Sequence, residues 1–279
     1  MLGYMSASSQ KMPLLLSAAV ALTACSPRTL VLVDLCSDAG TGICPKGATD
    51  ADTLTSLRRG LVGLWHLDDS VGDTTARDSS GNSNHATLEG LDPTLAWVTG
   101  RLGGALDMGG TGYAQILDSP SINGITDQVT LSAWVYFDGV ITAANQYGTA
   151  ISRQIGTTNE QYYHLSLQQP GNPTLFIGMS ASIPAARPTT SHQVAQKVWT
   201  HLAGTYDGSL ATLYVNGVEA GSVSISGTFP MDTTPVIVGG NGNAGAVTER
   251  FPGRIDEVAL YNRALASDEV ALLATAPVF

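Results

Sequence analysis

The segment Val129–Phe137, VTLSAWVYF, decides the fold. Its odd-numbered residues are all apolar, whereas its even-numbered residues carry hydroxyl groups or large rings. Strict alternation over a whole segment is typical of a strand that buries one face. The segment Gln161–Gln168, QYYHLSLQ, repeats this pattern. The two segments predict strands of a sheet that covers an apolar core.

Turn signals and one helix signal complete the predicted architecture. Three turn dipeptides follow apolar runs, namely Asp207-Gly208, Asn216-Gly217 and Asn241-Gly242. Such pairs supply the positive φ angles of tight hairpin turns, so we expect a β-meander. Only Ser267–Ala274 predicts a helix, with Ser267 as its N-cap and acidic residues in its first turn. The predicted fold class is therefore all-β, an antiparallel sandwich of two sheets with one short C-terminal helix.

The composition excludes several classes of function. The chain has 13 Lys and Arg against 23 Asp and Glu, with a formal net charge of −10. Nucleic-acid binding relies on basic residues that neutralise phosphates, so we expect no nucleic-acid partner. An acidic surface also disfavours adhesion to anionic lipid headgroups, and any membrane association would rest on an acyl chain.

The N-terminal residues predict an export signal. The apolar run Pro13–Leu22 is too short to span a bilayer as a helix. It ends in Leu22-Thr23-Ala24-Cys25, which resembles the bacterial lipobox, in which the cysteine is lipidated. We expect a signal peptide over 1–24, a tether over 25–59 and one domain over 60–279, anchored in the cell envelope and, because Ser26 follows the cysteine, in the outer membrane. An ordinary signal peptide with a chance Cys25 is the alternative.

Two further cysteines lie in the predicted tether. Cys36 and Cys44 form an even pair once Cys25 is lipidated. In an oxidising compartment a disulfide between them is the default expectation. A thiolate metal site is the rival, although no histidine lies nearby to complete it.

Five ordered motifs connect the predicted domain to a known family. They are Gly63–Asp68 (GLWHLD), Asp78–Thr87 (DSSGNSNHAT), Trp199–Gly208 (WTHLAGTYDG), Leu213–Gly217 (LYVNG) and Gly253–Leu265 (GRIDEVALYNRAL). In this order and spacing they resemble the LamG-like jelly-roll domains of the concanavalin A-like lectin/glucanase superfamily, over about residues 60–275. The resemblance implies two antiparallel sheets packed as a jelly roll. Function stays open, because this fold hosts lectins, enzymes and adhesion modules.

The resemblance also suggests a calcium site. Calcium takes six to eight oxygen ligands, which the loop around Asp78, Asn82 and Asn84 can supply in part. In related sandwiches such a loop commonly pairs with an acidic residue of the closing strand, here Asp256. We therefore expect a structural Ca²⁺ held by these four residues. Alternatively, the loop residues only cap their own backbone amides as Asx-turns.

Alternation along the closing strand fixes an expected direction for Asp256. It places Asp256 beside Val258 and on the face opposite to Glu257. A carboxylate among apolar neighbours needs a partner, either a cation or an arginine such as Arg254 or Arg263.

Glycosidase activity is not expected from the acidic residues. Retaining enzymes need two carboxyl groups about 5–5.5 Å apart. The six glutamates are all more than four positions apart, and Asp256 and Glu257 are expected on opposite faces. The glucanase pattern is therefore absent, and the chain is predicted not to be an enzyme.

Aromatic rings beside polar groups suggest a ligand-binding face. Trp134 and Tyr136 share one strand face, and Tyr162 and His164 share another. These four residues are the candidate ligand contacts, although large rings on a sandwich strand also serve as packing. We predict a non-catalytic binding module for a glycan or a surface protein. The alternatives are a structural or adhesion lipoprotein without a small ligand and an unusual polysaccharide hydrolase.

Overall fold

The computed structural model describes residues 55–142, 146–155, 160–179, 185–230, 233–243 and 246–275. The predicted signal peptide, lipidated Cys25 and disulfide between Cys36 and Cys44 lie outside these ranges. Within them, no helix is long and apolar enough to cross a membrane.

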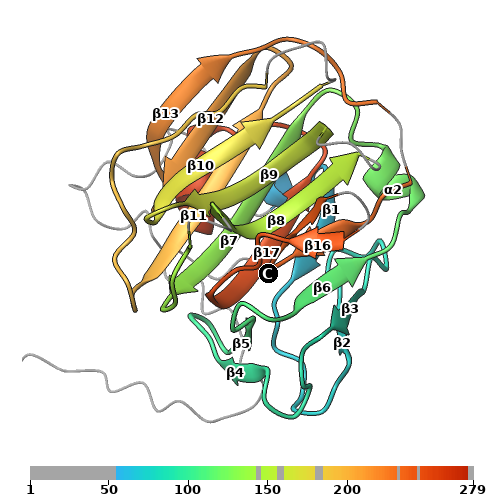
Figure 1. Ribbon diagram of the computed structural model, residues 1–279. Helices are drawn as coiled ribbons and strands as arrows, with labels where there is room; N and C mark the ends of the chain where they lie inside the picture. Colours follow the sequence, from blue (N-terminus) through green and yellow to red (C-terminus); the bar gives the residue numbers. More distant parts are fainter. Residues whose placement is uncertain are drawn as a thin grey trace, which may run out of the picture. The chain divides into compact units, whose positions relative to one another are not determined.

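The described residues form two antiparallel sheets packed face to face, as predicted (Figure 1). Sheet A has the order β13-β12-β11-β7-β17-β5-β4, with β1 also paired to β17. Its strands are β1 (Leu61–Trp65), β4 (Trp97–Thr99), β5 (Gly104–Asp107), β7 (Val129–Phe137), β11 (Trp199–Tyr206), β12 (Leu210–Val215), β13 (Val218–Ser224) and β17 (Gly253–Tyr261).

Sheet B has the order β10-β9-β8-β14-β6-β3-β2. Its strands are β2 (Thr75–Ala76), β3 (Ala86–Glu89), β6 (Tyr113–Ile116), β8 (Tyr147–Ile155), β9 (Glu160–Gln168), β10 (Asn172–Ile177) and β14 (Val236–Val238). A separate hairpin pairs β15 (Asn241–Asn243) with β16 (Ala246–Thr248). In Figure 1 the strands β8, β9 and β10 lie in front of β7 and β11.

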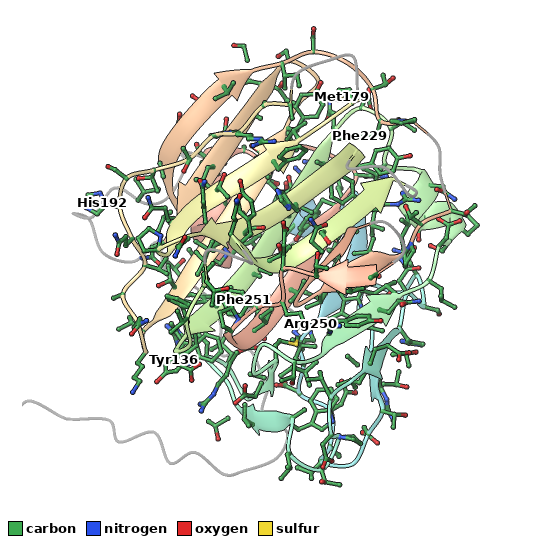
Figure 2. The ribbon with its side chains drawn as sticks, viewed as in Figure 1. Tyr136, Met179, His192, Phe229, Arg250 and Phe251 are labelled. Atoms are coloured by element: carbon green, nitrogen blue, oxygen red, sulfur yellow. The ribbon has the colours of Figure 1, made fainter. Side chains whose placement is uncertain are left out.

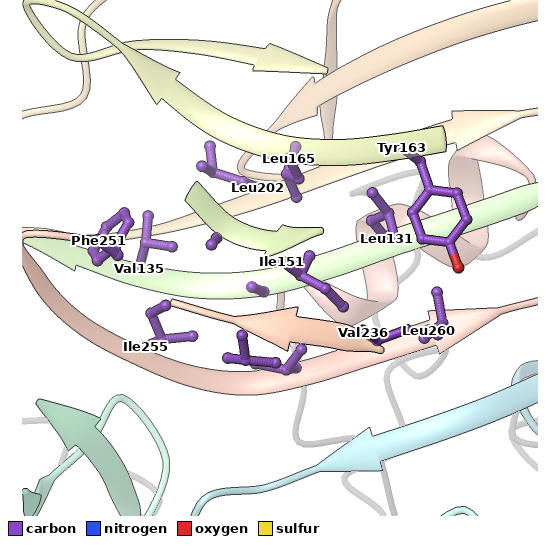
Figure 3. Packing of buried hydrophobic residues seen from close by; sticks show 14 of the residues in the cluster. Leu131, Val135, Ile151, Tyr163, Leu165, Leu202, Val236, Phe251, Ile255 and Leu260 are labelled. Atoms are coloured by element: carbon purple, nitrogen blue, oxygen red, sulfur yellow. The ribbon is translucent and has the colours of Figure 1, made fainter. Parts of the chain in front are cut away.

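The core lies between the two sheets. The predicted apolar face of β7 is confirmed, because all five of its odd-numbered residues belong to the core cluster. Leu131 and Val135 of β7 project into the same interior as Ile151 of β8 and Leu165 of β9 (Figure 3). Burying such side chains contributes roughly 1.5–3 kcal/mol each, so this interface dominates the stability of the domain.

Two of the three predicted turns are confirmed and one is wrong. Gly208 lies between β11 and β12, and Asn216 and Gly217, both with positive φ, lie between β12 and β13. By contrast, Asn241 begins β15 instead of a turn, because the chain leaves β14 through Gly239, which has a φ of 86°.

A β-bulge corrects the expected direction of Asp256. The register between β17 and β7 shifts between Asp256 and Ala259, and Glu257 adopts a φ of 49°. Ile255 and Val258 both lie in the core, so the two residues between them share the outer side of sheet A. The prediction that Asp256 and Glu257 point to opposite faces is therefore wrong, because simple alternation cannot anticipate a bulge.

The helices are short. The predicted C-terminal helix is α3 (Ser267–Leu273), whose N-cap is Ala266, one residue earlier than expected. Two helical segments were not predicted, α2 (Pro120–Asn123) and a turn over 55–58. Leu57 from that turn packs with Leu273 of α3 on the outer side of sheet A. The last residues of the predicted tether thus contact the domain.

Candidate functional site

The four predicted ligand contacts belong to different sheets. Trp134 and Tyr136 lie on β7 of sheet A, whereas Tyr162 and His164 lie on β9 of sheet B. The neighbours of His164 along β9, Tyr163 and Leu165, point into the core (Figure 3). Hence His164 is on the outer side of sheet B, across the sandwich from Trp134, and the four residues do not form one site.

The sheet B pair is covered. His164 is 2% exposed, with its ring centroid 4.9 Å from that of Phe176 and 5.8 Å from that of Tyr147. Burial, with a smaller contribution from the charge of Arg187, lowers the pKa of His164 to about 3, so its imidazole is neutral. Tyr162 is 1% exposed and its ring packs edge-on against Phe229.

The hairpin of β15 and β16 helps to close this side of sheet B. Asn241 donates from Nδ2 to Glu249 Oε2 at 2.9 Å, and the backbone amide of Thr149 donates to the carbonyl of Glu249. Ser166 donates to the hydroxyl of Thr149 at 2.9 Å. Burial raises the pKa of Glu249. Most polar groups of this network bond to one another, although Asn241 Oδ1 is buried without a hydrogen-bond partner.

The sheet A pair lies among further rings and cations. The rings of Tyr136 and Trp199 are 5.4 Å apart, and both residues are only partly buried. The guanidinium of Arg101 lies 4.8 Å from the ring centroid of Trp134, and that of Arg254 lies 5.2 Å from that of Tyr136. We call these five residues the ring row. Figure 2 shows Tyr136 near the end of β7, far from Phe229 at the other end of the sandwich.

Trp134 packs against a buried, hydrogen-bonded pair of polar residues. Its ring packs edge-on against His201, whose Nε2 lies 2.8 Å from the hydroxyl of Ser132. Burial lowers the pKa of His201 to about 3. Among the described residues its Nδ1 has no hydrogen-bond partner, so no acid orients this imidazole as a base. At 1% exposure, His201 is a packed residue of this face.

A small hollow opens beside Trp134. It is lined by Leu64, Leu102, Ser132, Trp134, Glu257, Ala259, Tyr261 and Leu273 and has room for about one water molecule. At its edge Glu257 Oε2 lies 2.9 Å from His66 Nδ1. The hollow is too small for a sugar ring, so a larger ligand must lie on the surface beside it.

Asp256 binds the backbone of the turn that borders this surface. Its Oδ2 accepts hydrogen bonds from the backbone amides of Arg101 and Leu102 at 2.7 and 2.9 Å, and its Oδ1 accepts one from that of Glu257 at 2.7 Å. Burial, aided by the charge of Glu257, raises the pKa of Asp256 to about 8. A Cβ on Gly100 would lie 2.6 Å from Asp256 Oδ2, so this turn requires glycine. Asp256 therefore fixes the position of Arg101, and it pairs with neither Arg254 nor Arg263.

The predicted calcium ligands make hydrogen bonds of their own. Both oxygens of Asp78 are occupied, because they accept from the amides of Leu64, Ser80 and Asn84 and from the Ser80 hydroxyl. Asp78 and Asp256 share no hydrogen-bond partner among these contacts.

The two asparagines of the loop also make other contacts. Asn82 and Asn84 use their Nδ2 atoms to donate to the carbonyl of Val62. In the described part of the chain no group of three or more His, Cys, Asp or Glu side chains is placed to hold a metal. Asp78, Asn82 and Asn84 thus form Asx-type loop contacts, and the shared calcium ion stays a prediction.

Arg101 and Trp199 were missed as candidate contacts. Arg101 lies outside every motif in the sequence, and Trp199 lies within a motif but was not singled out as a ligand contact. Only pairing across strands, with Trp199 opposite Tyr136, brings these residues to the ring row. No local pattern could have signalled this arrangement.

The family comparison decides the class of this fold. The model of the concanavalin A-like lectin/glucanases superfamily matches residues 108–271. The chain belongs to this superfamily. No curated protein matches the sequence.

Solved structures give the same fold. Domain 4 of AbnA, a GH43 extracellular arabinanase from Geobacillus stearothermophilus, in complex with arabinotriose, is 26% identical with a TM-score of 0.59, covering 77% of this chain and 98% of that one. The binding domain of Paraclostridial Mosquitocidal Protein 1 is 21% identical with a TM-score of 0.57, and the match covers 78% of this chain and 52% of that one. Trypanosoma rangeli sialidase is 19% identical with a TM-score of 0.56, and the match spans 77% of this chain and 32% of that one.

Proposed function

We propose that this domain is a non-catalytic module that binds a glycan at the ring row on the outer side of sheet A. The observation that carries the proposal is the cluster of partly exposed Tyr136 and Trp199 beside two guanidinium groups. Rings and polar donors on a rigid sheet are what an amphipathic sugar needs. The similarity to Domain 4 of the arabinanase AbnA, solved in complex with arabinotriose, supports glycan as the ligand class.

The contrast between the two outer faces supports sheet A as the location. On sheet B, His164 and Tyr162 are fully buried, and the hydroxyls of Thr149 and Ser166 bond within the network. A ligand there would first have to displace the rings of Tyr147 and Phe176, which pack against His164. On sheet A the rings of Tyr136 and Trp199 are partly exposed as they stand.

The state of the carboxylates supports a binding role without catalysis. Asp256 and Glu257 lie on the same side of sheet A, but Asp256 accepts three backbone amides and Glu257 contacts His66. A retaining glycosidase needs a nucleophile and an acid facing the same sugar. Neither carboxylate is presented in that way.

The proposed subcellular location of the protein is the cell envelope. Lipidation at Cys25 would hold the domain outside the cytoplasm through the predicted tether, where glycans are abundant ligands. A surface protein is the alternative ligand, and an adhesion component without a small ligand is the alternative role.

A glycan array of the full chain tests the proposal, run with calcium and again with a chelator. Trp199→Ala should reduce binding about tenfold, since one large contact is worth roughly 1–2 kcal/mol. The matched control is Tyr147→Ala, a partly buried ring on sheet B, which should leave binding unchanged. Absence of binding to any glycan would overturn the proposal and direct the search to protein partners.

A further inference from the structure

The rings of the ring row are capped by cations. Arg101 lies over the face of Trp134, and Trp134 is only 8% exposed. Arg254 lies over Tyr136 in the same way. A sugar that approaches these two rings therefore meets guanidinium N–H groups before it meets an aromatic face. The surface presents hydrogen-bond donors that carry positive charge.

These donors are largely unused. Within the described residues, the guanidinium of Arg101 has no hydrogen bond and no ion pair, and its contact is with the Trp134 ring. Arg254 forms an ion pair with Asp107, with 3.5 Å between Nε and Oδ2, but its buried Nε makes no hydrogen bond. A buried guanidinium donor without an acceptor is costly, so an incoming anion would relieve that cost.

The two cations are neighbours on one face. Trp134 and Tyr136 are two residues apart on β7, and side chains on one face of a strand repeat about every 7 Å. Arg101 reaches Trp134 from the turn between β4 and β5, and Arg254 reaches Tyr136 from β17. Together they flank a stretch of surface about one sugar unit long.

Nearby acids neutralise this pair only in part, because Asp107 forms an ion pair with Arg254 but no described acid pairs with Arg101. Asp256 is directed at backbone amides and Glu257 at His66. Asp107 is the acid that approaches Arg254, and its other oxygen accepts from the Gly109 amide. The net charge of −10 acts mainly through distant groups, and at physiological salt these are screened beyond about 8 Å.

We propose that the glycan recognised at the ring row is acidic, with a sugar carboxylate that accepts hydrogen bonds from Arg101 and Arg254. This inference rests on the proposed function. The guanidinium fork matches a carboxylate in geometry, and Tyr136 and Trp199 contact the sugar ring. Neutral glycans bind more weakly at this surface, because they leave Arg101 without an anionic partner.

The test compares charged and uncharged forms of the same sugars. The full chain is applied to an array that carries neutral oligosaccharides, uronic-acid oligosaccharides, their methyl esters and sulfated oligosaccharides. We expect the strongest signals from carboxylated glycans, at least tenfold weaker signals from the matched methyl esters, and a decrease with rising salt. Arg101→Gln should reduce binding of the acidic glycans about tenfold, and Arg101→Lys should restore only part of it.

The control is an equivalent pair on the other sheet. Arg187 lies 4.8 Å from the ring centroid of Phe176, the same distance as Arg101 from Trp134, so Arg187→Gln should have no effect. Binding confined to neutral glycans, or equal binding of acids and esters, would overturn this inference while the proposed function stands. A preference for sulfated over carboxylated glycans would overturn the carboxylate assignment. A chain that binds no glycan at all would overturn both.

Discussion

The outer faces of sheets A and B begin from the same sequence pattern and end in opposite states. On β7 the outward rings lie beside two cations, whereas on β9 the outward His164 is buried against the rings of Tyr147 and Phe176 on the neighbouring strands. The difference arises from what packs against each face. On sheet A, α3 and the turn over 55–58 cover only part of the face, through a cluster that includes Leu57 and Leu273. The residues that pack against each face, and not the sequence of the strand itself, determine which ring can contact a ligand.

The largest expected effect is a loss of stability from a substitution on the outer face of sheet B. His164→Ala should lower the free energy of unfolding by about 3 kcal/mol, because it removes a buried ring packed between Tyr147 and Phe176. Urea unfolding measures this loss, and glycan binding of the folded variant should stay unchanged. His192→Ala, at an exposed histidine, is the control and should remain within about 0.5 kcal/mol. A strong loss of binding by folded His164→Ala would contradict the division between the two faces.

The next effect concerns Asp256, which holds the turn that carries Arg101 on the outer side of sheet A. Asp256→Ala should cost about 2–3 kcal/mol, because three backbone amides lose their acceptor. Asp256→Asn keeps an acceptor oxygen and should cost less. Glycan binding should fall in Asp256→Ala, since the turn that carries Arg101 is released.

The same residue gives a pH dependence. Folding raises the pKa of Asp256 to about 8, so the folded chain binds this proton more tightly than the unfolded chain does. Its contribution to stability is complete below about pH 4, the ordinary pKa of Asp, and is lost as the pH rises through about 8. Chemical unfolding at pH 6 and pH 9 should show lower stability at pH 9, and Asp256→Asn should reduce this difference. An equal pH dependence in both chains would exclude Asp256 as its source.

A smaller stability effect is expected within the ring row. Tyr136→Ala should weaken glycan binding about tenfold while costing only about 1 kcal/mol of stability, since the side chain is partly exposed. Titration calorimetry and urea unfolding of one preparation separate the two quantities. Unfolding as severe as that of His164→Ala would show that Tyr136 is a packing residue.

The smallest expected effect is that of calcium. The oxygens of Asp78 already accept four hydrogen bonds, so a chelator should leave the melting temperature unchanged. Asp78→Asn should lower the melting temperature by the same amount with and without calcium. A calcium-dependent rise that Asp78→Asn abolishes would restore the predicted metal site.

Local patterns were sufficient for the architecture and insufficient for the site. Alternation in β7 correctly predicted its core face, because side-chain direction in a regular strand follows from the backbone alone. The same rule failed in β17, where the bulge at Glu257 places two successive carboxylates on one side. The prediction for Asn241-Gly242 failed in a similar way, because pairing of β15 with β16 outweighed the local turn preference.

The sequence by itself determined the two-sheet fold, its superfamily and two of its hairpin turns, since these depend on periodicity and on residues that tolerate positive φ. The tertiary structure alone decided which aromatic residues are accessible and which cations lie against them. Arg101, Trp134 and Arg254 are far apart in the chain, and they meet because Asp256 holds one turn and β17 pairs with β7. Contacts of this kind depend on where whole strands pack, and no short segment encodes that information.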